Sequence, residues 1–469
     1  MGRLLPAWAL ALGTLAAACG GGGGPDAGPA LPAWQRELPA AVDGFGARRG
    51  LSPARGIIHL HSPYSHDACD GEPRPGPNGE IDEACLANLR EALCATRVDY
   101  AALTEHDASM ADEEFETLFL QREGDVLVTG AASTPIASRM TCPNGHTVLF
   151  TVGGENDLMP IMLDAHPPGT ASERHEVYNA EDAATVALFR SLGGLVWIPH
   201  TEQRPIELLR ALEPDGIEIY QLHANIDPNI RVDHLGLDSA GAIQAVAEFA
   251  DTNPTGPEPD LALMAFLEPN QPSIDKWNTL LGEGLRLAGS GGTDAHENSL
   301  PITLRDGERG DSYRRMIRWF ANVALVSDPS DPEEIQAAIA AGRFFVAFEL
   351  FGTPSGFDFF APGAEMGGEV TASTSAAATL ALPTVYGLDS SLPAPSIRGR
   401  ILRIDAGGVT EVAAGETASV TAALDAPGAY RAEVLITPRH YGAYLGHLGT
   451  AIAEREQVWV YSNPIYVVP

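Results

Sequence analysis

The sequence has few basic residues and almost no lysine. Among its 469 residues are 29 Lys and Arg against 62 Asp and Glu, a net charge of −33, and Lys276 is the only lysine. A chain this acidic repels an extended polyanion, so we expect no duplex nucleic acid as its main partner. No internal stretch reaches the ~20 apolar residues that a membrane-spanning helix requires. The 45% of hydrophobic residues is nevertheless enough for a large core.

The one long apolar segment lies at the N-terminus and is too short to anchor the chain. Arg3 supplies a positive charge, and residues 4–18 form an apolar run that ends in small residues before Cys19. This composition is typical of a secretory signal peptide. The run Ala16-Ala17-Ala18-Cys19 resembles a bacterial lipobox, although an ordinary cleaved signal is the alternative.

The lipobox resemblance implies an exported lipoprotein that contacts the membrane through a lipid on Cys19. Residues 1–19 would be the signal peptide, and the Gly/Pro-rich residues 20–54 are expected to form a tether. The mature protein would lie in the periplasm or at the cell surface, and Gly20 after the cysteine favours the outer membrane by resemblance to lipoprotein sorting rules.

Cysteine is also scarce, with five in the chain. Once Cys19 is set aside, an even number remains, and in an exported chain this favours two disulfides. We favour Cys69–Cys85 and Cys94–Cys142, although the sequence permits three connectivities. A zinc site of four cysteines would need a pair spaced by two residues, which the sequence does not contain.

Two regions with different patterns follow the tether. Residues 55–350 alternate between short apolar strands and helix-like segments, which is typical of a parallel sheet or barrel in an α/β protein. From about residue 363 the helical period disappears, and residues 363–469 predict a small all-β, sandwich-like domain. In the first region, strands are expected at 56–61, 99–104, 125–131, 146–152, 195–200, 216–220, 285–289 and 323–327.

Histidines and aspartates gather around the ends of these predicted strands. The carboxyl ends of parallel strands meet on one face, so side chains far apart in sequence converge there. The candidate metal ligands are His59, His61, Asp67, His106, His146, His200, Asp294 and His296. Imidazoles with carboxylates suit zinc, manganese or iron, and six imidazoles exceed what one ion can use. We therefore expect two or three divalent ions.

The ordered motifs resemble the polymerase and histidinol phosphatase (PHP) superfamily of metallohydrolases. They are His59-x-His61, Thr104-Glu105-His106, Gly145-His146, the strand ending at His200, and Asp294-x-His296. The Trp277-Asn278-Thr279 stretch and Gly291-Gly292-Thr293-Asp294 are similar to its CehA/McbA-type branch. The resemblance implies a distorted (β/α)7 barrel that usually cleaves phosphoesters, with some branch members cleaving carbamates or amides.

The same resemblance distributes the ligands over three metal sites. It implies that His59, His61 and Asp294 hold the first metal and that His146 and His200 hold the second. It places Asp67, His106 and His296 at the third, with His66 as the alternative to Asp67.

One position departs from the pattern of that family. Its third strand ends in Gly-x-Glu, whose glutamate bridges two metals, whereas this sequence has Gly130-Ala131-Ala132, and Ala132 cannot coordinate a metal. Possible substitutes are Glu105, Glu155, Glu202 and Glu218, among which the sequence does not choose. Because Glu218 lies within an apolar strand, we interpret it first as structural or as a residue behind the ligands.

These observations favour a metal-dependent hydrolase, in first place a phosphoesterase. In this hypothesis a metal-activated hydroxide attacks a small-molecule substrate, and His200 or His296 protonates the leaving group. Hydrolysis of an amide, carbamate or ester is the alternative, because the scarcity of basic residues suits a neutral substrate. A non-catalytic binding lipoprotein with a degraded metal site is a third hypothesis, suggested by Ala132.

The remaining polar candidates have no motif around them. We interpret His175, His223, His234, His440 and His447 as ordinary polar histidines. Arg139, Arg204 and Arg305 are candidates to clamp an anionic substrate, although solvated surface charge explains each equally well. The oligomeric state is left open.

Overall fold

The computed structural model describes residues 31–469 except 72–73, 75–78, 251–252, 254 and 301. The predicted signal peptide, the predicted lipidation site Cys19 and the first part of the predicted tether lie outside the described residues. Residues Trp34–Pro469 form one compact unit. Within the described part of the chain, the helices are all too short or too polar to cross a membrane.

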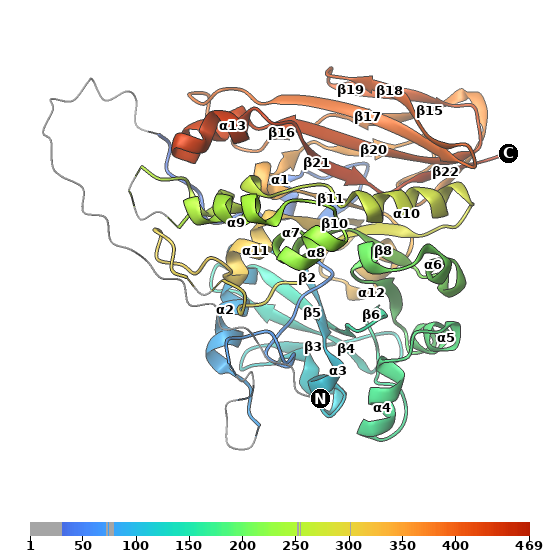
Figure 1. Cartoon of the computed structure of the whole chain (residues 1–469). Coiled ribbons are helices and arrows are strands. Elements are labelled where there is room, and N and C mark those ends of the chain that lie inside the picture. Colours follow the sequence, from blue (N-terminus) through green and yellow to red (C-terminus); the bar gives the residue numbers. More distant parts are fainter. Residues whose placement is uncertain (1–30, 72–73, 75–78, 251–252, 254, 301) are drawn as a thin grey trace, which may run out of the picture. The chain divides into compact units, whose positions relative to one another are not determined.

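Short helices and strands alternate through the first two thirds of this unit (Figure 1). The strands before residue 350 are β1 (Ser52–Ile57), β2 (Tyr100–Glu105), β3 (Val126–Thr129), β4 (Pro135–Thr141), β5 (Thr147–Gly154), β6 (Met159–Ile161), β7 (Leu195–Ile198), β8 (Gly216–Gln221), β9 (Ala288–Gly292), β10 (Ala321–Val326) and β11 (Phe344–Ala347). The later strands are β12 (Pro354–Ser355), β13 (Asp358–Phe360), β14 (Glu369–Thr371), β15 (Ser373–Ala381), β16 (Thr384–Val385), β17 (Ser396–Asp405), β18 (Gly408–Gly415), β19 (Ser419–Leu424), β20 (Gly428–Thr437), β21 (Gln457–Ser462) and β22 (Ile465–Val468).

The helices connect and cover these strands. The α-helices are α1 (Ala41–Gly44), α2 (Glu83–Ala95), α3 (Asp107–Met110), α4 (Ala171–Tyr178), α5 (Ala183–Ser191), α6 (Ile206–Leu212), α7 (Leu222–Ile226), α8 (Pro228–Asp233), α9 (Ser239–Glu248), α10 (Gln271–Gly282), α11 (Tyr313–Trp319), α12 (Pro332–Ala340) and α13 (Gly449–Ala453). Short 3-10 turns are η1 (Phe115–Phe119), η2 (Thr201–Gln203), η3 (Pro259–Ala265), η4 (Glu349–Phe351) and η5 (Arg439–Leu448).

The strands form a mixed α/β structure built on two main sheets. The larger has the order β14-β22-β20-β21-β11-β10-β1-β2-β5-β4-β3 with β17 and β18 alongside, and the smaller has the order β6-β7-β8-β9. β1, β2 and β5 are parallel, as are β7, β8 and β9. Isolated bridges link the sheets at Leu60–Ala295 and at Val152–Leu163. The α/β class predicted from the sequence is thus confirmed.

The C-terminal strands continue the larger sheet. β21 pairs antiparallel with β11, and β20 pairs with β21, β22 and β17. In Figure 1 the red strand β21 accordingly lies beside β11. The predicted boundary between a barrel and a sandwich therefore runs through one continuous sheet.

The beginning of the unit also differs from the predicted tether. Phe45 is fully buried, Arg48 is buried, and β1 starts at Ser52. The Trp34 indole donates to Asp260 Oδ2 at 2.8 Å and its ring packs against Tyr441. Residues 34–54 therefore belong to the folded unit.

Both favoured disulfides are confirmed. Cys69 is bonded to Cys85 and Cys94 to Cys142. The first joins the loop that follows His61 to the start of α2, and the second joins the end of α2 to the residue after β4.

A buried aspartate holds several arginines near the N-terminal segment. Asp260 Oδ1 accepts hydrogen bonds from Arg315 Nη1 and Arg314 Nη2, both at 2.5 Å, and the Asp260 side chain is 1% exposed. The three guanidinium groups of Arg314, Arg315 and Arg318 all lower the pKa of Asp260 although its burial alone would raise it. Glu258 and Asp306 lie beside Asp260, and this acidic group is satisfied by arginine.

Replacing Asp260 with asparagine is expected to destabilise the protein by about 3–5 kcal/mol, because it leaves buried guanidinium charge without its partner. Denaturant unfolding measures the change. Glu207→Gln is the control, since its pair with Arg210 is on the surface and Glu207 is 79% exposed, for which we expect less than about 1 kcal/mol. Equal effects of the two substitutions would contradict the prediction.

Candidate metal centre

The ends of the parallel strands bring polar side chains together, as the sequence predicts. His59 and His61 follow β1, His106 follows β2 and Glu155 follows β5. In the second sheet, His200 follows β7, His223 follows β8 and Asp294 follows β9. Alternate residues of an extended chain point the same way, so His59 and His61 share a face while Ile58 and Leu60 are buried on the other.

Four buried donors form the tightest group: His59, His61, Glu155 and Asp294. His61 Nε2 lies 3.3 Å from His59 Nε2, 3.4 Å from Glu155 Oε2 and 2.9 Å from Asp294 Oδ1. His59 Nε2 lies 3.5 Å from each of the same two carboxylate oxygens. Metal–ligand bonds of about 2.1 Å in a tetrahedron separate the donors by about 3.4 Å. These four side chains therefore fit one transition-metal ion.

The carboxylates of Glu155 and Asp294 also lie close to histidines outside this group. Asp294 Oδ2 lies 3.5 Å from His200 Nε2 and 3.0 Å from His223 Nδ1, which makes a second group of donors. Glu155 Oε1 lies 3.3 Å from His200 Nε2, and Glu155 Oε2 lies 3.4 Å from His106 Nε2. Each carboxylate can therefore bridge neighbouring ions.

A third group consists of His61, Asp67 and His106. Asp67 Oδ2 lies 3.3 Å from His106 Nε2, and Asp67 Oδ1 accepts a hydrogen bond from Ser65 Oγ at 2.9 Å. His66 is exposed and meets His106 only ring to ring, with centroids 4.8 Å apart. Of the two alternatives in the sequence, Asp67 is the one that faces the other donors.

Carboxylates behind the ligands orient their imidazoles. Glu218 Oε1 lies 2.6 Å from His59 Nδ1, and Glu218 Oε2 accepts a hydrogen bond from His200 N at 2.9 Å. Such partners fix the ring and its tautomer. Gly292 makes room for this carboxylate, since a Cβ there would lie 1.9 Å from Glu218 Oε1. The interpretation of Glu218 as a residue behind the ligands agrees with this placement.

The only lysine supports the turn that follows His200. Lys276 Nζ donates to Thr201 O at 2.8 Å and to Glu202 O at 3.0 Å. Glu202 Oε2 accepts from Asn270 Nδ2 at 2.8 Å, while Glu202 Oε1 lies 3.5 Å from His200 Nδ1. α10 thus holds η2 and its glutamate beside the His200 ring.

Two of the converging residues have a left-handed backbone. His200 and Asp294 both have φ of 47°. This region is uncommon for residues other than glycine, and strain of this kind concentrates at functional sites. The turn at each strand end therefore directs its side chain toward the group.

Opposite charges in the centre shift the pKa values of its members. Burial alone would lower the pKa of His59, but Glu218, Glu155 and Asp294 outweigh it and raise that pKa well above 6.5. The pKa values of His61 and His200 are raised well above 6.5 for the same reason. Burial would raise the pKa of Glu155 and of Asp294, but the histidines hold both well below their ordinary values.

Glu155 lies at the end of the third parallel strand, where the resemblance leads us to expect the Gly-x-Glu glutamate. β3 and β4 form an antiparallel hairpin, and the third parallel strand is β5. Its last two residues and the residue that follows them are Gly153-Gly154-Glu155, which is the Gly-x-Glu pattern expected there. Ala132 lies in the exposed turn between β3 and β4, so the inference of a missing glutamate is corrected.

His146 is not brought to the centre. It precedes the eight-residue strand β5, whose length of about 26 Å separates it from Glu155 at the other end. His146 Nε2 lies 2.7 Å from Val98 O. Its predicted place at a second metal is corrected, and His223 occupies the corresponding position beside His200.

His296 lies at the border of the centre. Its Nε2 is 3.9 Å from Asp294 Oδ1, and its Nδ1 is 3.3 Å from Ser299 Oγ. Its ring lies between those of His61 and His223, with centroids 6.0 Å and 5.8 Å away. It is buried but belongs to none of the three donor groups.

His223 is the residue that the sequence interpretation missed. The sequence predicts an ordinary polar histidine, yet His223 lies two residues after β8 and contacts Asp294. Its place at the end of a parallel strand was the available signal. Of the other histidines so classed, His175 contacts Asp107, His440 is buried near Phe351 and His447 lies near Glu248 on the surface.

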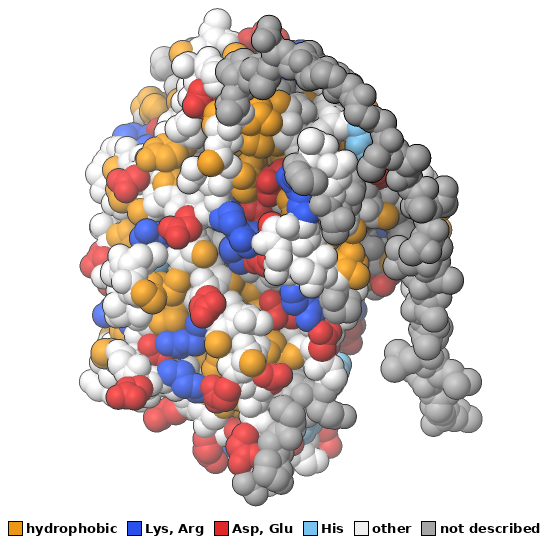
Figure 2. Space-filling model, turned by 90° about the vertical axis from the view of Figure 1, so that its left-hand side faces the viewer, with side chains coloured by type: hydrophobic (Ala, Val, Ile, Leu, Met, Phe, Trp, Pro, Cys, Tyr) orange, Lys and Arg blue, Asp and Glu red, His pale blue; other side chains and the backbone are white. Residues whose placement is uncertain are grey.

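The three arginines considered as substrate clamps have other partners. Arg204 pairs with Asp157 at 2.6 Å, Arg305 pairs with Glu258 at 3.3 Å, and Arg139 donates to Ser330 O at 2.7 Å. On the face drawn in Figure 2, basic side chains likewise stand singly or in small groups among acidic ones.

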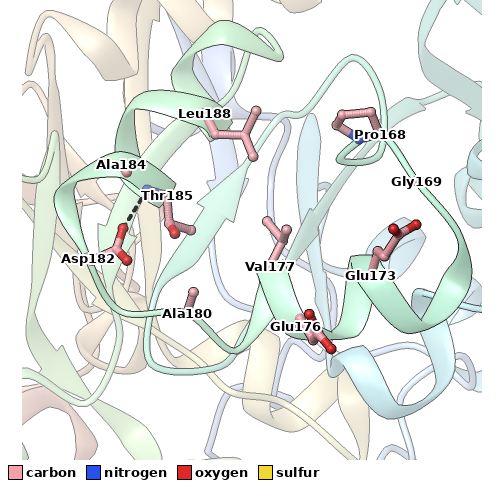
Figure 3. A pocket seen from close by; sticks show the side chains of 10 residues that line it. All are labelled: Pro168, Gly169, Glu173, Glu176, Val177, Ala180, Asp182, Ala184, Thr185 and Leu188. Carbon is pink, nitrogen blue, oxygen red and sulfur yellow. Dashed lines mark hydrogen bonds between the residues drawn. The ribbon is translucent and has the colours of Figure 1, made fainter.

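A surface pocket lies apart from the donor groups. It is formed by α4, α5 and their connection, and its lining includes Glu173, Glu176, Val177, Asp182 and Leu188 (Figure 3). In the close-up, Asp182 accepts from the backbone N of Thr185 and so caps α5. None of the centre's donors line this pocket.

No family model matches the chain, and no curated protein matches its sequence. One similar solved structure is a two-domain protein from Bacteroides vulgatus described as containing a predicted PHP-like metal-dependent phosphoesterase. It is 10% identical with a TM-score of 0.33, over 92% of this chain and 99% of that chain. PsfC from Pseudomonas syringae is 13% identical with a TM-score of 0.28, over 58% of this chain and 82% of that chain.

Metal binding is expected to strengthen as pH rises and to release protons. Only neutral imidazole binds a metal, and the pKa values of His59, His61 and His200 are raised well above 6.5 in the metal-free protein. Zinc titrations followed by calorimetry in buffers of different ionisation heat, at about pH 6 and about pH 8, measure both effects. Affinity that does not change between these values would contradict the prediction.

The stability of the metal-free protein should follow the opposite trend. A raised histidine pKa contributes stability that is complete at low pH and is lost as pH rises through the folded-state pKa. Glu155 and Asp294 have lowered pKa values, so the stability that they contribute is complete at any pH above the ordinary pKa of a carboxyl group. This contribution is lost only in acid. We therefore expect the thermal unfolding midpoint of the metal-free protein to fall as the pH rises from neutral to basic. With metal bound, we expect the midpoint to stay constant over the same pH range.

Proposed function

We propose that the chain is a metal-dependent hydrolase of the PHP type. A phosphoesterase is the first candidate. The observation that carries the proposal is the convergence of His59, His61, Glu155 and Asp294 at distances suited to a metal ion. Under this proposal the two linked sheets form a distorted (β/α)7 barrel around the centre.

Three neighbouring sites would hold two or three divalent ions. The first would use His59, His61, Glu155 and Asp294, the second His200 and His223 with Asp294, and the third Asp67 and His106 with His61. Zinc, manganese and iron suit this set of imidazoles and carboxylates. Bound cations supply an activated water and neutralise the charge that develops on the substrate oxygens.

The chain itself provides the orientation and the proton transfer. Glu218 holds His59 through Nδ1 and the His200 backbone through N, so both imidazoles keep one direction. His200 contacts both Glu155 and Asp294, which assigns it to ligation rather than to proton transfer. His296 stands outside the donor groups, and we assign to it the proton that reaches the leaving group.

The charges around the centre favour a phosphodiester over a phosphomonoester. A monoester carries two negative charges and gains more than a diester from cationic side chains that hydrogen-bond to its oxygens. Arg204 and Arg305 are paired with carboxylates, and Lys276 donates to backbone carbonyls. A diester carries a single negative charge and therefore depends less on free cationic side chains.

An amide, carbamate or ester substrate is the second candidate. The same pairing of the basic side chains favours it, since a neutral substrate needs none of them. A panel of p-nitrophenyl phosphates, bis(p-nitrophenyl) phosphate, aryl carbamates and aryl esters, tested with the purified protein loaded with zinc, manganese or iron, separates the candidates. Absence of turnover on every substrate, with full metal loading, would contradict the hydrolase and leave a metal-binding lipoprotein.

We further propose that the protein is exported and tethered by a lipid on Cys19, in the outer membrane facing the periplasm or the cell surface. The two disulfides support an oxidising compartment. The tether would end where Trp34 joins the folded unit. Metabolic labelling with a fatty acid, compared between the parent and Cys19→Ala, tests the anchor.

A further inference from the structure

The strand that leads to Asp294 has an open edge. β9 pairs with β8 along its length, whereas its other edge pairs with no described strand, and its backbone bonds to the backbone of the neighbouring sheet only beyond the strand's end, where Asp294 N donates to His59 O at 3.1 Å. The strand reads AGSGG. Glycine loses the most conformational freedom on folding and adds no side chain to pack, so this is a weak strand.

Two asparagine amides bond to that open edge. Asn322, on β10, accepts from Gly291 N at 2.9 Å and donates to Gly291 O at 2.8 Å. Asn463, which follows β21, accepts from Gly289 N at 2.8 Å and donates to Gly289 O at 3.2 Å. Both asparagines are 1% exposed.

The two amides reproduce the bonding of a β ladder. Gly289 and Gly291 are two residues apart, which is the spacing at which one edge of a strand repeats its N–H and C=O groups. Each amide presents one acceptor and one donor to one residue, as the backbone of a neighbouring strand would. Without them the N–H and C=O groups of both buried glycines would lose partners that a buried backbone requires.

We propose that Asn322 and Asn463 are positioning residues of the metal centre, which replace a missing strand beside β9 and so fix Asp294. The inference rests on the metal binding proposed above. Asn463 belongs to the C-terminal region and also donates to Phe344 O at 3.1 Å on β11. The C-terminal strands thus take part in building the centre.

Cobalt binding by the full chain tests the inference. The variants are Asn322→Ala and Asn463→Ala, with Ser462→Ala as the matched control. Ser462 is equally buried, but its hydroxyl accepts from Ala432 N on β20 at 2.7 Å and not from β9. Each protein is titrated with Co²⁺ and followed by its visible absorption, and its unfolding midpoint is measured separately so that affinity is compared only where the protein is folded.

We expect both asparagine variants to bind Co²⁺ about 10- to 100-fold more weakly, as for other outer partners of metal ligands, while Ser462→Ala binds as the parent does. If an alanine variant does not fold, the aspartate variant at the same position, Asn322→Asp or Asn463→Asp, replaces it, because a carboxylate keeps the acceptor for the glycine N–H and exchanges the amide donor for a second, negatively charged oxygen. Unchanged Co²⁺ affinity and spectrum in folded asparagine variants would overturn the inference. A parent that binds Co²⁺ but hydrolyses nothing would refute the proposed enzyme and not this role.

Discussion

Replacing Asp294 with asparagine is expected to lower kcat/KM by about 10³-fold or more, because one carboxylate serves two donor groups. Its Oδ1 lies 2.9 Å from His61 Nε2 and its Oδ2 lies 3.0 Å from His223 Nδ1. An amide keeps the shape but loses the charge that binds and bridges cations. Metal analysis after dialysis and turnover of bis(p-nitrophenyl) phosphate measure the two losses together.

Asparagine is preferable to alanine here because of the backbone. At φ of 47° an alanine would add strain, whereas Asn tolerates the left-handed region. Asp275→Asn is the control, since Asp275 is exposed on α10 and its carboxylate accepts a surface hydrogen bond from Gln271. Full metal content and undiminished turnover in Asp294→Asn would show that the proposed centre is misassigned.

The residues of this centre that the sequence predicts correctly all lie at the ends of predicted strands or follow them. Polar residues that follow buried parallel strands must converge, and for His59, His61, His106, His200 and Asp294 this held. The even number of cysteines also predicts two disulfides but permits three connectivities, of which the favoured one, Cys69–Cys85 with Cys94–Cys142, is confirmed. The strand ends are predictable because a local pattern there has a single topological consequence.

The errors at His146 and Ala132 share one cause. Periodicity does not distinguish the strands of an inserted hairpin from those of the parallel series. Counting β3 as the third strand assigned its end to Ala132, and the true third strand, β5, was treated as the next one. His146, which precedes β5, is then predicted as a ligand, whereas Glu155, which follows β5, is the residue at the centre.

Other features depend on contacts between distant residues, which a single sequence does not encode locally. His223 was overlooked because the first turn of α7 begins directly after β8, and the position looked like a loop. The continuation of the sheet from β11 to β21 joins Val346 to Tyr461, more than a hundred positions apart. His200 and Asp294 have a left-handed backbone although neither is a glycine, so the sequence gives no signal for these turns.

Two substitutions test whether the glutamate of the centre is at position 155, as the structure indicates, or belongs at position 132, as the sequence predicts. Glu155→Gln is expected to lower kcat/KM by about 10²- to 10³-fold and to weaken metal retention. Its oxygens lie 3.3 to 3.5 Å from His59, His61, His106 and His200. No other carboxylate in the described centre contacts all four of these rings.

The reciprocal variant, Ala132→Glu, is expected to leave both quantities unchanged. Ala132 is exposed in the β3–β4 turn, so an added carboxylate would enter solvent. In the double variant Glu155→Gln/Ala132→Glu the activity should stay at the level of Glu155→Gln, because the new charge is on the wrong strand. A gain of activity from Ala132→Glu, in either background, would mean that the hairpin turn does approach the metals and that Glu155 is not the bridge.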